Sequence, residues 1–244
     1  MLFQLGKRKR SGRLLWRASS AGTTTQGDRL VKSANRPLAS LLIGVCAANR
    51  PRVSGASGLV FTSQPLDIAK SALSSATTGT DKILIPVAFF LIKHPKDNIL
   101  FDTGDNDKIM QDQTHWGPLA AMLDKGVSAD LAIDTQLEKV GVKPSDINYV
   151  ILGHMHRDHA GNVGKFSTAT IIIQRDEIEN AFWPKPGTAG PYITSDFSML
   201  RSGIRAGMAN KQPTIELNGD LDLFGDGSVY IHRAVSHRQE TKLL

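Results

Sequence analysis

Apolar positions first gather into regular runs near residue 82. KILIPVAFFLIKHP (82–95) and NILFDTG (98–104) are rich in β-branched and aromatic residues, and the turn-forming residues 95–97 separate them. Such a pair of runs predicts two strands joined as a hairpin. Residues 51–80, which precede them, are polar and rich in Gly, Ser and Thr, a composition typical of turns, so we expect a polar N-terminal segment there.

Helical and extended patterns alternate after this hairpin. ADLAIDTQLEKVG (129–141) has the apolar spacing of a helix, with Ser128 as its candidate N-cap. INYVILG (147–153) has the composition of a buried strand, and TATIIIQRDEIENAF (168–182) predicts a strand that runs into a short helix. Two or three antiparallel strands are expected within 215–235. The alternation favours an α/β fold in which helices cover the sheets.

The positive charge of the chain is concentrated near its N-terminus. The formal net charge is +6, yet residues 1–36 hold nine Lys and Arg against one acid, Asp28, so the remainder carries a net charge of −2. A protein that binds nucleic-acid phosphates carries its positive charge on the folded body, and we therefore expect no nucleic-acid partner. Residues 1–50 are instead predicted to be a basic leader, either disordered or signal-like.

This leader leaves the cellular compartment open. Residues 32–48 resemble a secretory signal, because a basic stretch precedes an apolar run, LASLLIGVCAA (38–48), that ends in small residues. The basic stretch is long for a signal, so we expect either a cytoplasmic or a periplasmic or secreted protein. No run reaches the roughly 18–20 apolar residues of a membrane span. The single cysteine, Cys46, excludes an intrachain disulfide, and nothing in the sequence fixes the oligomeric state.

Three histidines and one aspartate crowd into the six positions 154–159, directly behind an apolar run. His154 and His156 are two residues apart, so their imidazoles point to the same side of an extended segment. Asp158 and His159 follow where the chain is expected to turn into a helix. Imidazole and carboxylate groups are ligands of zinc, and so many ionisable groups at a strand end are costly unless something pairs them. We therefore predict a metal site, which could activate water and polarise a carbonyl group.

The remaining histidines have a different context. His94 and His115 have no neighbour in the sequence at metal-site spacing, and we interpret both as structural residues. His232 is expected to lie on the outward side of a strand, and it too is interpreted as structural.

The stretch HMHRDH (154–159) matches the H-x-H-x-D-H signature of the metallo-β-lactamase superfamily, which the chain resembles. Residues 85–104 resemble the paired strands and D-T-G turn of its N-acyl-homoserine lactonase branch. Residues 143–166 and 170–177 resemble that branch's next strand, metal loop and following strand. The resemblance covers about residues 82–237. It implies an αβ/βα metallo-β-lactamase sandwich and a zinc-dependent hydrolase that opens the lactone ring of a small molecule, an N-acyl-homoserine lactone.

The resemblance also assigns roles to individual residues. His154 and His156 would bind the first of two zinc ions, and Asp158 and His159 the second. Asp158 is in addition the candidate catalytic residue. Asp102 of the D-T-G turn would orient a ligand histidine, a role that tunes metal sites.

A further ligand is assigned less directly. Aligning GSVYIHRAVSH with the family places His237 at the position of the histidine that completes the first metal site. The Thr-Pro-Gly that precedes this histidine in the family is replaced here by residues 234–236, which are Ala-Val-Ser.

The C-terminal end departs from the family. The chain ends at Leu244, whereas family members continue through an aspartate that bridges both metals and a final histidine. Codons able to encode HRQETKLL (237–244) give family-like text when shifted by one base. We therefore expect residues 81–244 to form an incomplete hydrolase domain from a truncated or frameshifted gene, with fewer than two bound ions and impaired activity.

Two alternatives remain open at this point. Another hydrolase of the same fold, acting on a thioester or a β-lactam, shares the same six-residue signature. A non-catalytic remnant that binds at most one metal ion is the alternative from a different functional class.

Overall fold

The computed structural model describes residues 2–4, 55–72, 79–123, 128–187, 189–201 and 212–233. Its strands are β1 (Leu2–Gln4), β2 (Ser57–Thr62), β3 (Leu66–Ala69), β4 (Lys82–Ile85), β5 (Ala88–Lys93), β6 (Asn98–Phe101), β7 (Tyr149–Ile151), β8 (Thr170–Gln174), β9 (Thr214–Leu217), β10 (Leu221–Asp222) and β11 (Tyr230–His232). Its α-helices are α2 (Ile133–Glu138), α3 (Arg157–Ala160), α4 (Arg175–Phe182) and α5 (Thr194–Phe197). Its 3-10 helices are η1 (Lys70–Ala72), η2 (Asp107–Met110), η3 (Gln113–Met122), η4 (Ala129–Leu131), η5 (Pro144–Asp146), η6 (Val163–Lys165) and η7 (Ser198–Arg201).

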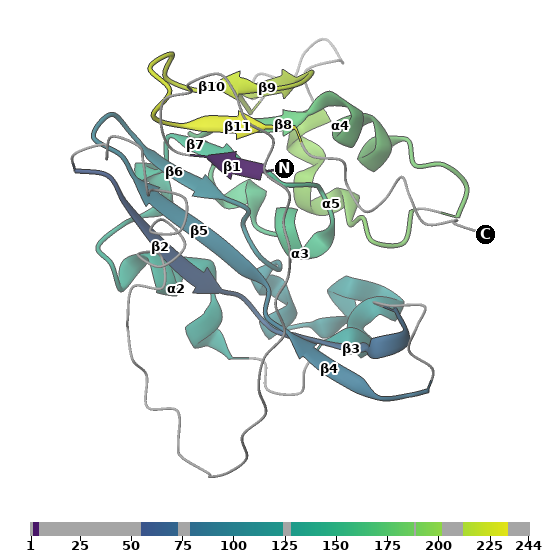
Figure 1. The fold of residues 1–244 in the computed structure, drawn as a ribbon. Coiled ribbons are helices and arrows are strands. Elements are labelled where there is room, and N and C mark those ends of the chain that lie inside the picture. The colour runs from purple at the N-terminus through teal and green to yellow at the C-terminus, as the bar shows by residue number, and fades with distance from the viewer. Residues whose placement is uncertain are drawn as a thin grey trace, which may run out of the picture.

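One six-stranded sheet, in the order β2-β5-β6-β7-β8-β9, organises the molecule (Figure 1). β2, β5 and β6 pair antiparallel, and β6 through β9 pair parallel. The predicted hairpin is confirmed as the β5–β6 pair, in which Leu91 lies opposite Leu100. The strand and helix predicted within 168–182 are β8 and α4. The expected α/β class is therefore confirmed.

The first half of the predicted hairpin is divided between two sheets. β4 pairs with β3 in a separate two-stranded sheet, whereas β5 pairs with β2 and β6. The division falls at Pro86, which has no main-chain N–H to offer a ladder. Val87 after it uses its carbonyl to accept the N–H of Ser63. The polar segment 51–80 thus contributes two strands, β2 and β3, to the structure.

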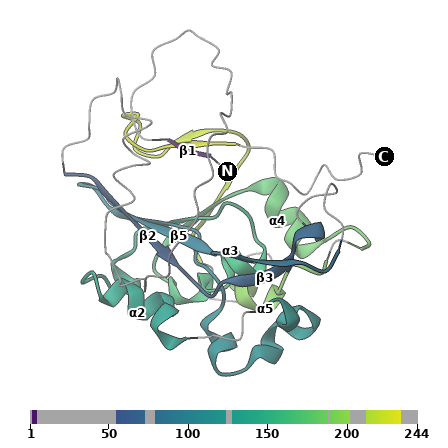
Figure 2. The ribbon, with the colours of Figure 1, turned by 60° about the horizontal axis from the view of Figure 1, so that its bottom comes forward.

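Two apolar layers cover the two faces of the main sheet. Alternate residues of the parallel strands face opposite sides, so that Val150 and Leu152 join one cluster and Ile151 joins the other. The first cluster includes residues of α2, α4 and α5, and the second includes Ile231 of β11. Figure 2 shows α2, α3 and α5 on one side of the sheet and the β1–β11–β10 sheet on the other. Burial on both faces explains why these strands read as continuous apolar runs.

Two further sequence predictions are confirmed only in part. The helix expected over 129–141 is η4 followed by α2, and the Ser128 hydroxyl accepts the N–H of Asp130 as its predicted cap. Three strands lie within the region predicted from 215–235, but only β10 and β11 pair antiparallel. β9 instead runs parallel to β8 at the edge of the main sheet, which the apolar pattern alone did not distinguish.

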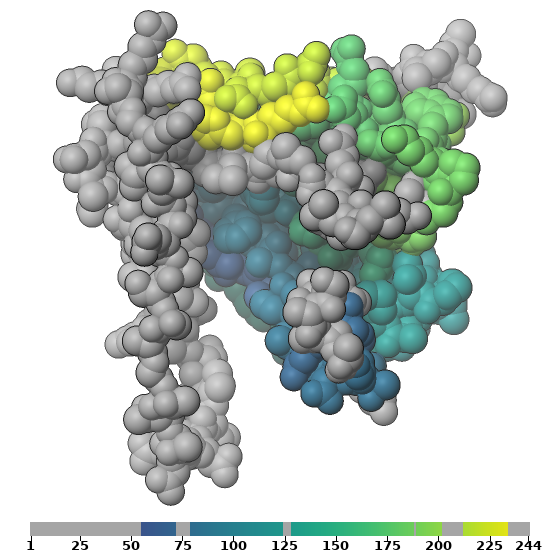
Figure 3. Space-filling model, turned by 45° about the vertical axis from the view of Figure 1, so that its right-hand side comes forward, coloured from purple at the N-terminus to yellow at the C-terminus, as the bar shows by residue number. Residues whose placement is uncertain are grey.

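The β3–β4 hairpin protrudes from the body of the molecule, as the space-filling view shows in blue (Figure 3). It packs on η3 through a small separate cluster that includes Leu66, Val87 and Trp116. None of the described helices has the length and apolar content needed to span a bilayer.

Candidate metal centre

The clustered ionisable residues lie at the carboxyl ends of two neighbouring parallel strands. Asp102 directly follows β6, and His154 to His159 follow β7. Because β6 and β7 run parallel, their carboxyl ends meet at one edge of the sheet, where ligands of open α/β sheets commonly bind. The fold therefore brings together two segments that are about fifty residues apart in the sequence.

His154 and His156 lie on the same side of an extended segment, as their spacing predicts. Their ring centroids are 4.4 Å apart, while the intervening Met155 is fully buried in the core. The main-chain N–H of Met155 donates to the buried carboxylate of Glu177 at 2.9 Å. The segment between the two histidines is thus held by a buried side chain and a buried hydrogen bond.

His159 is oriented by Asp102. Nδ1 of His159 lies 2.8 Å from Oδ2 of Asp102, whose Oδ1 accepts the N–H of Gly153 at 2.7 Å. Asp102 is 3% exposed and has a φ of 58°, a left-handed conformation that costs a residue with a side chain about 1–2 kcal/mol. A carboxylate held on Nδ1 fixes the imidazole plane and leaves Nε2 for a ligand.

The nitrogen that Asp102 leaves available faces Asp158. Nε2 of His159 lies 3.5 Å from Oδ2 of Asp158, and the His154 ring centroid lies 4.0 Å from that of His159. Two donors on one tetrahedral zinc ion are about 3.3 Å apart, given metal–ligand distances near 2.0–2.1 Å. The donor types and the Asp158–His159 spacing therefore fit zinc.

The described donors do not form a closed cage. Among the described residues, no group of three His, Cys, Asp or Glu side chains is arranged so as to hold a metal ion. The predicted ligand His237 lies outside the described residues. The described part of the centre thus supplies an oriented set of donors, which would have to converge when an ion binds.

The acidic surroundings favour a proton on His159 in the metal-free chain. Burial opposes its protonation, but the hydrogen bond and charge of Asp102, together with Asp158 and Asp105, raise the pKa of His159 from 6.5 to about 9. A metal ion must displace this proton, because only the neutral imidazole is a ligand.

The metal-free protein is expected to lose stability as the pH rises from about 6.5 to about 9. Because the folded pKa of His159 lies above its unfolded value, the stabilisation is complete below pH 6.5 and is lost through pH 9. Urea unfolding in EDTA at pH 6, 7.5 and 9 measures this loss. Asp102→Asn, which keeps an acceptor for Gly153 but removes the charge, should flatten the dependence. An equal slope in both proteins would contradict the assignment.

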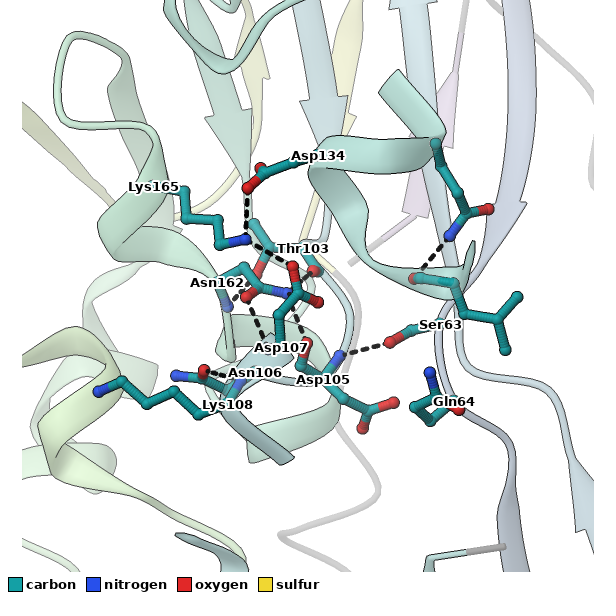
Figure 4. A network of polar contacts seen from close by, with 12 residues as sticks. Ser63, Gln64, Thr103, Asp105, Asn106, Asp107, Lys108, Asp134, Asn162 and Lys165 are labelled. Atoms are coloured by element: carbon teal, nitrogen blue, oxygen red, sulfur yellow. Dashed lines mark hydrogen bonds and ion pairs between the residues drawn. The ribbon is translucent and has the colours of Figure 1, made fainter. Parts of the chain in front are cut away.

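A network of hydrogen bonds, most of them between a side chain and the main chain, clamps the loop after Asp102 against the metal motif (Figure 4). The N–H and hydroxyl of Thr103 both donate to the carbonyl of His159, at 2.7 and 2.9 Å. The buried Asn162 side chain donates to the carbonyls of Thr103 and Asp105 and accepts the N–H of Asp107. This clamp fixes the distance between Asp102 and His159.

Several residues around the centre were not singled out from the sequence. They are Asp105, Arg157, Asn162 and Glu177. Glu177 lies inside a segment that resembles the family, and Asn162 lies three residues after His159, so their positions carried some signal. Asp105 follows the D-T-G turn, but nothing in its local sequence indicates that it becomes buried beside the motif.

The histidines interpreted as structural have partners away from the clustered donors. His94 is 8% exposed, stacks on Phe224 at 4.6 Å and accepts the N–H of Lys96. His115 lies 2.8 Å from a carboxylate oxygen of the buried Asp196. Nδ1 of His232, at the end of β11, lies 3.1 Å from Oδ2 of Asp220.

The residues of this centre lie within the range that a known family model matches. The family model for the Metallo-beta-lactamase superfamily matches residues 84–239, which is more than half of the chain. The matched range contains the H-x-H-x-D-H motif, Asp102 and the described part of the sheet from β5 onward.

Curated relatives share about a third of their residues with the chain. The N-acyl homoserine lactonase AttM of Azorhizobium caulinodans is 36% identical over 146 residues, which cover 59% of this chain and 53% of the relative. AttM of Agrobacterium fabrum is 34% identical over 146 residues, with the same coverage. The chain thus spans about half the length of the curated relatives it matches.

A solved structure gives the same result for the fold. The structure of an N-acyl homoserine lactone hydrolase, with N-hexanoyl-L-homoserine bound at its catalytic metal centre, superposes with a TM-score of 0.55. It is 22% identical, and the alignment covers 68% of this chain and 61% of the other. This likeness confirms the predicted fold, and the metal centre and ligand are properties of that structure.

Proposed function

The chain belongs to the metallo-beta-lactamase superfamily, and we propose that it is a zinc-dependent hydrolase that opens the lactone ring of N-acyl homoserine lactones. The observation that carries the proposal is the group of His154, Asp158 and His159 at one sheet edge, with Asp102 held on His159. Relatives named as N-acyl homoserine lactonases support the substrate class.

Four side chains of the centre would bind zinc, and Asp102 orients one of them. His154 and His156 would hold a zinc ion from one side, and Asp158 and His159 would hold a second position. Asp102 fixes the plane of His159 through Nδ1, and a zinc ion would take the place of the proton on Nε2. Bound zinc polarises a carbonyl group and makes water a nucleophile near neutral pH, the two requirements of lactone hydrolysis.

We propose that Asp158 accepts the proton of the attacking water. Its side chain is 19% exposed, so it is accessible from the site, and its Oδ2 faces the ligand nitrogen of His159. An accessible carboxylate beside a ligand nitrogen can accept a proton during attack and return it to the leaving alkoxide.

The proposal predicts metal-dependent hydrolysis of N-hexanoyl and N-decanoyl homoserine lactones. Acid release on ring opening can be followed in a weakly buffered indicator assay, before and after dialysis against a chelator. We expect the chelated protein to lose hydrolysis and added zinc to restore it.

Parallel substrates separate the competing functions. Turnover of a thioester or a cephalosporin without turnover of either lactone would indicate a different hydrolase of this fold. Zinc binding without turnover of any of these substrates would favour a non-catalytic role. Absence of zinc binding would refute the metal centre itself.

A further inference from the structure

Asp105 carries a carboxylate that is buried in the loop after β6. Its residue is 1% exposed, and neither carboxylate oxygen has a partner among the described residues. In Figure 4 its side chain points away from the Asn162 clamp and carries no dashed contact. Burying a carboxylate without an ion pair is strongly unfavourable, so a group of this kind calls for a compensating charge.

The main chain prevents Asp105 from turning towards solvent. Its N–H donates to the hydroxyl of Ser63 at 3.1 Å, and its carbonyl accepts from the side chain of Asn162. On the other side, Gly161 packs so closely that a Cβ there would lie 2.6 Å from the carbonyl carbon of Asp105. The burial of the carboxylate is therefore built into the loop.

Charged groups of the metal motif act on Asp105. Burial raises the pKa of Asp105 well above the usual value, and the charge of Asp158 raises it further, while the neighbouring Ser63 hydroxyl and the charges of Arg157 and His159 lower it. Asp105 also contributes to the raised pKa of His159. The carboxylate thus lies in the electrostatic field of the Asp158–His159 half of the centre.

Arg157 is the obvious alternative counter-charge, but its contacts lie elsewhere. Its guanidinium lies 4.5 Å from the ring centroid of Trp116, and it donates to the sulfur of Met122. Within the described part of the chain, no ion pair joins Arg157 to Asp105, and Nε of Arg157 is buried without a partner. The charge of Arg157 therefore acts on Asp105 without a direct ion pair and balances it only in part.

We propose that Asp105 is a positioning carboxylate of the metal centre, which strengthens zinc binding at the Asp158–His159 half through its negative charge. This inference rests on the proposed metal centre. A divalent ion held by Asp158 and His159 would supply the missing counter-charge, and Asp105 in turn would hold that ion more tightly. The role is additional to the ligands and the orienting Asp102 that the family resemblance assigns.

The test compares Asp105→Asn with Asp107→Asn. Asparagine keeps the shape of Asp105 and removes its charge, while Asp107 lies on the same loop but pairs with Lys165. Zinc affinity is measured by competition with a chromophoric chelator, and thermal stability is measured in EDTA.

We expect Asp105→Asn to bind zinc about 10–100-fold more weakly, as for other groups that do not themselves bind the metal. Its metal-free form should melt at a higher temperature than the unsubstituted protein, whereas Asp107→Asn should keep its zinc affinity.

Each other outcome has a definite meaning. Equal zinc affinity in Asp105→Asn and the unsubstituted chain would overturn this inference while leaving the metal centre intact. A lower melting temperature of metal-free Asp105→Asn would mean that the charge of Asp105 is already balanced without a metal ion, and it would also overturn the inference. Should Asp105→Asn not fold, Asp105→Ser serves as a second neutral variant with the same expected loss. An unsubstituted chain that binds no zinc would instead refute the proposed function.

Discussion

Replacing His154 by alanine is expected to remove zinc from the centre and to abolish lactone hydrolysis. The His154 ring lies between those of His156 and His159, with centroid distances of 4.4 and 4.0 Å. Groups that only orient ligands contribute about 10–100-fold to metal affinity or activity. Loss of a ligand at the middle of the cluster should cost more, because no other described donor lies in its place.

Metal content by emission spectroscopy and chelator competition measure the effect directly. His232→Ala is the matched control, because it also removes one imidazole but from β11, where His232 contacts Asp220. The control should keep both its zinc and its hydrolytic activity. Undiminished zinc content in His154→Ala would mean that the ion is held by residues other than the motif.

Much of the fold could be predicted because burial leaves a clear pattern. The parallel strands are covered on both faces, so that Val150, Ile151 and Leu152 are all fully buried and form a continuous apolar run. β2 was missed because it is an edge strand of mixed burial, and Gly and Ser flank its apolar residues Leu59 and Phe61. Its identity as a strand depends on pairing with β5, which local composition does not encode.

For the site too, the features that depend on local sequence could be predicted, and those that depend on tertiary contacts could not. The spacing of His154 and His156 fixes their shared side within one segment, so the sequence predicted it. The family resemblance predicted that Asp102 orients a ligand histidine without specifying which one, and in the structure Asp102 contacts His159. The burial of Asp105 and the clamp by Asn162 arise only when the loop after β6 meets the metal motif.

Gly161→Ala is the substitution expected to destabilise the fold most, because Gly161 lies where the loop after β6 packs against the metal motif. A Cβ at residue 161 would lie 2.2 Å from the main-chain nitrogen of Asn106 and 2.6 Å from the carbonyl carbon of Asp105. Both are backbone atoms, so no side-chain rotation relieves the clash. The loop must move away, and the hydrogen bond from Gly161 N–H to the carbonyl of Gly104 would be lost with it. Overpacking of this kind costs about 1–3 kcal/mol or more.

The same displacement should weaken the metal centre, which gives the prediction a second measurement. The loop that moves also carries Asp102, so His159 would lose its orienting carboxylate as the folded state loses stability. Urea unfolding in EDTA and zinc competition should therefore both change in Gly161→Ala. Gly190→Ala is the matched control, because among the described residues other than its chain neighbours no atom lies within 4 Å of the Cβ it would add, and both measurements should stay near those of the unsubstituted chain. Equal stability of the two variants would mean that the loop tolerates the methyl group, and the clamp would then not determine the geometry of the centre.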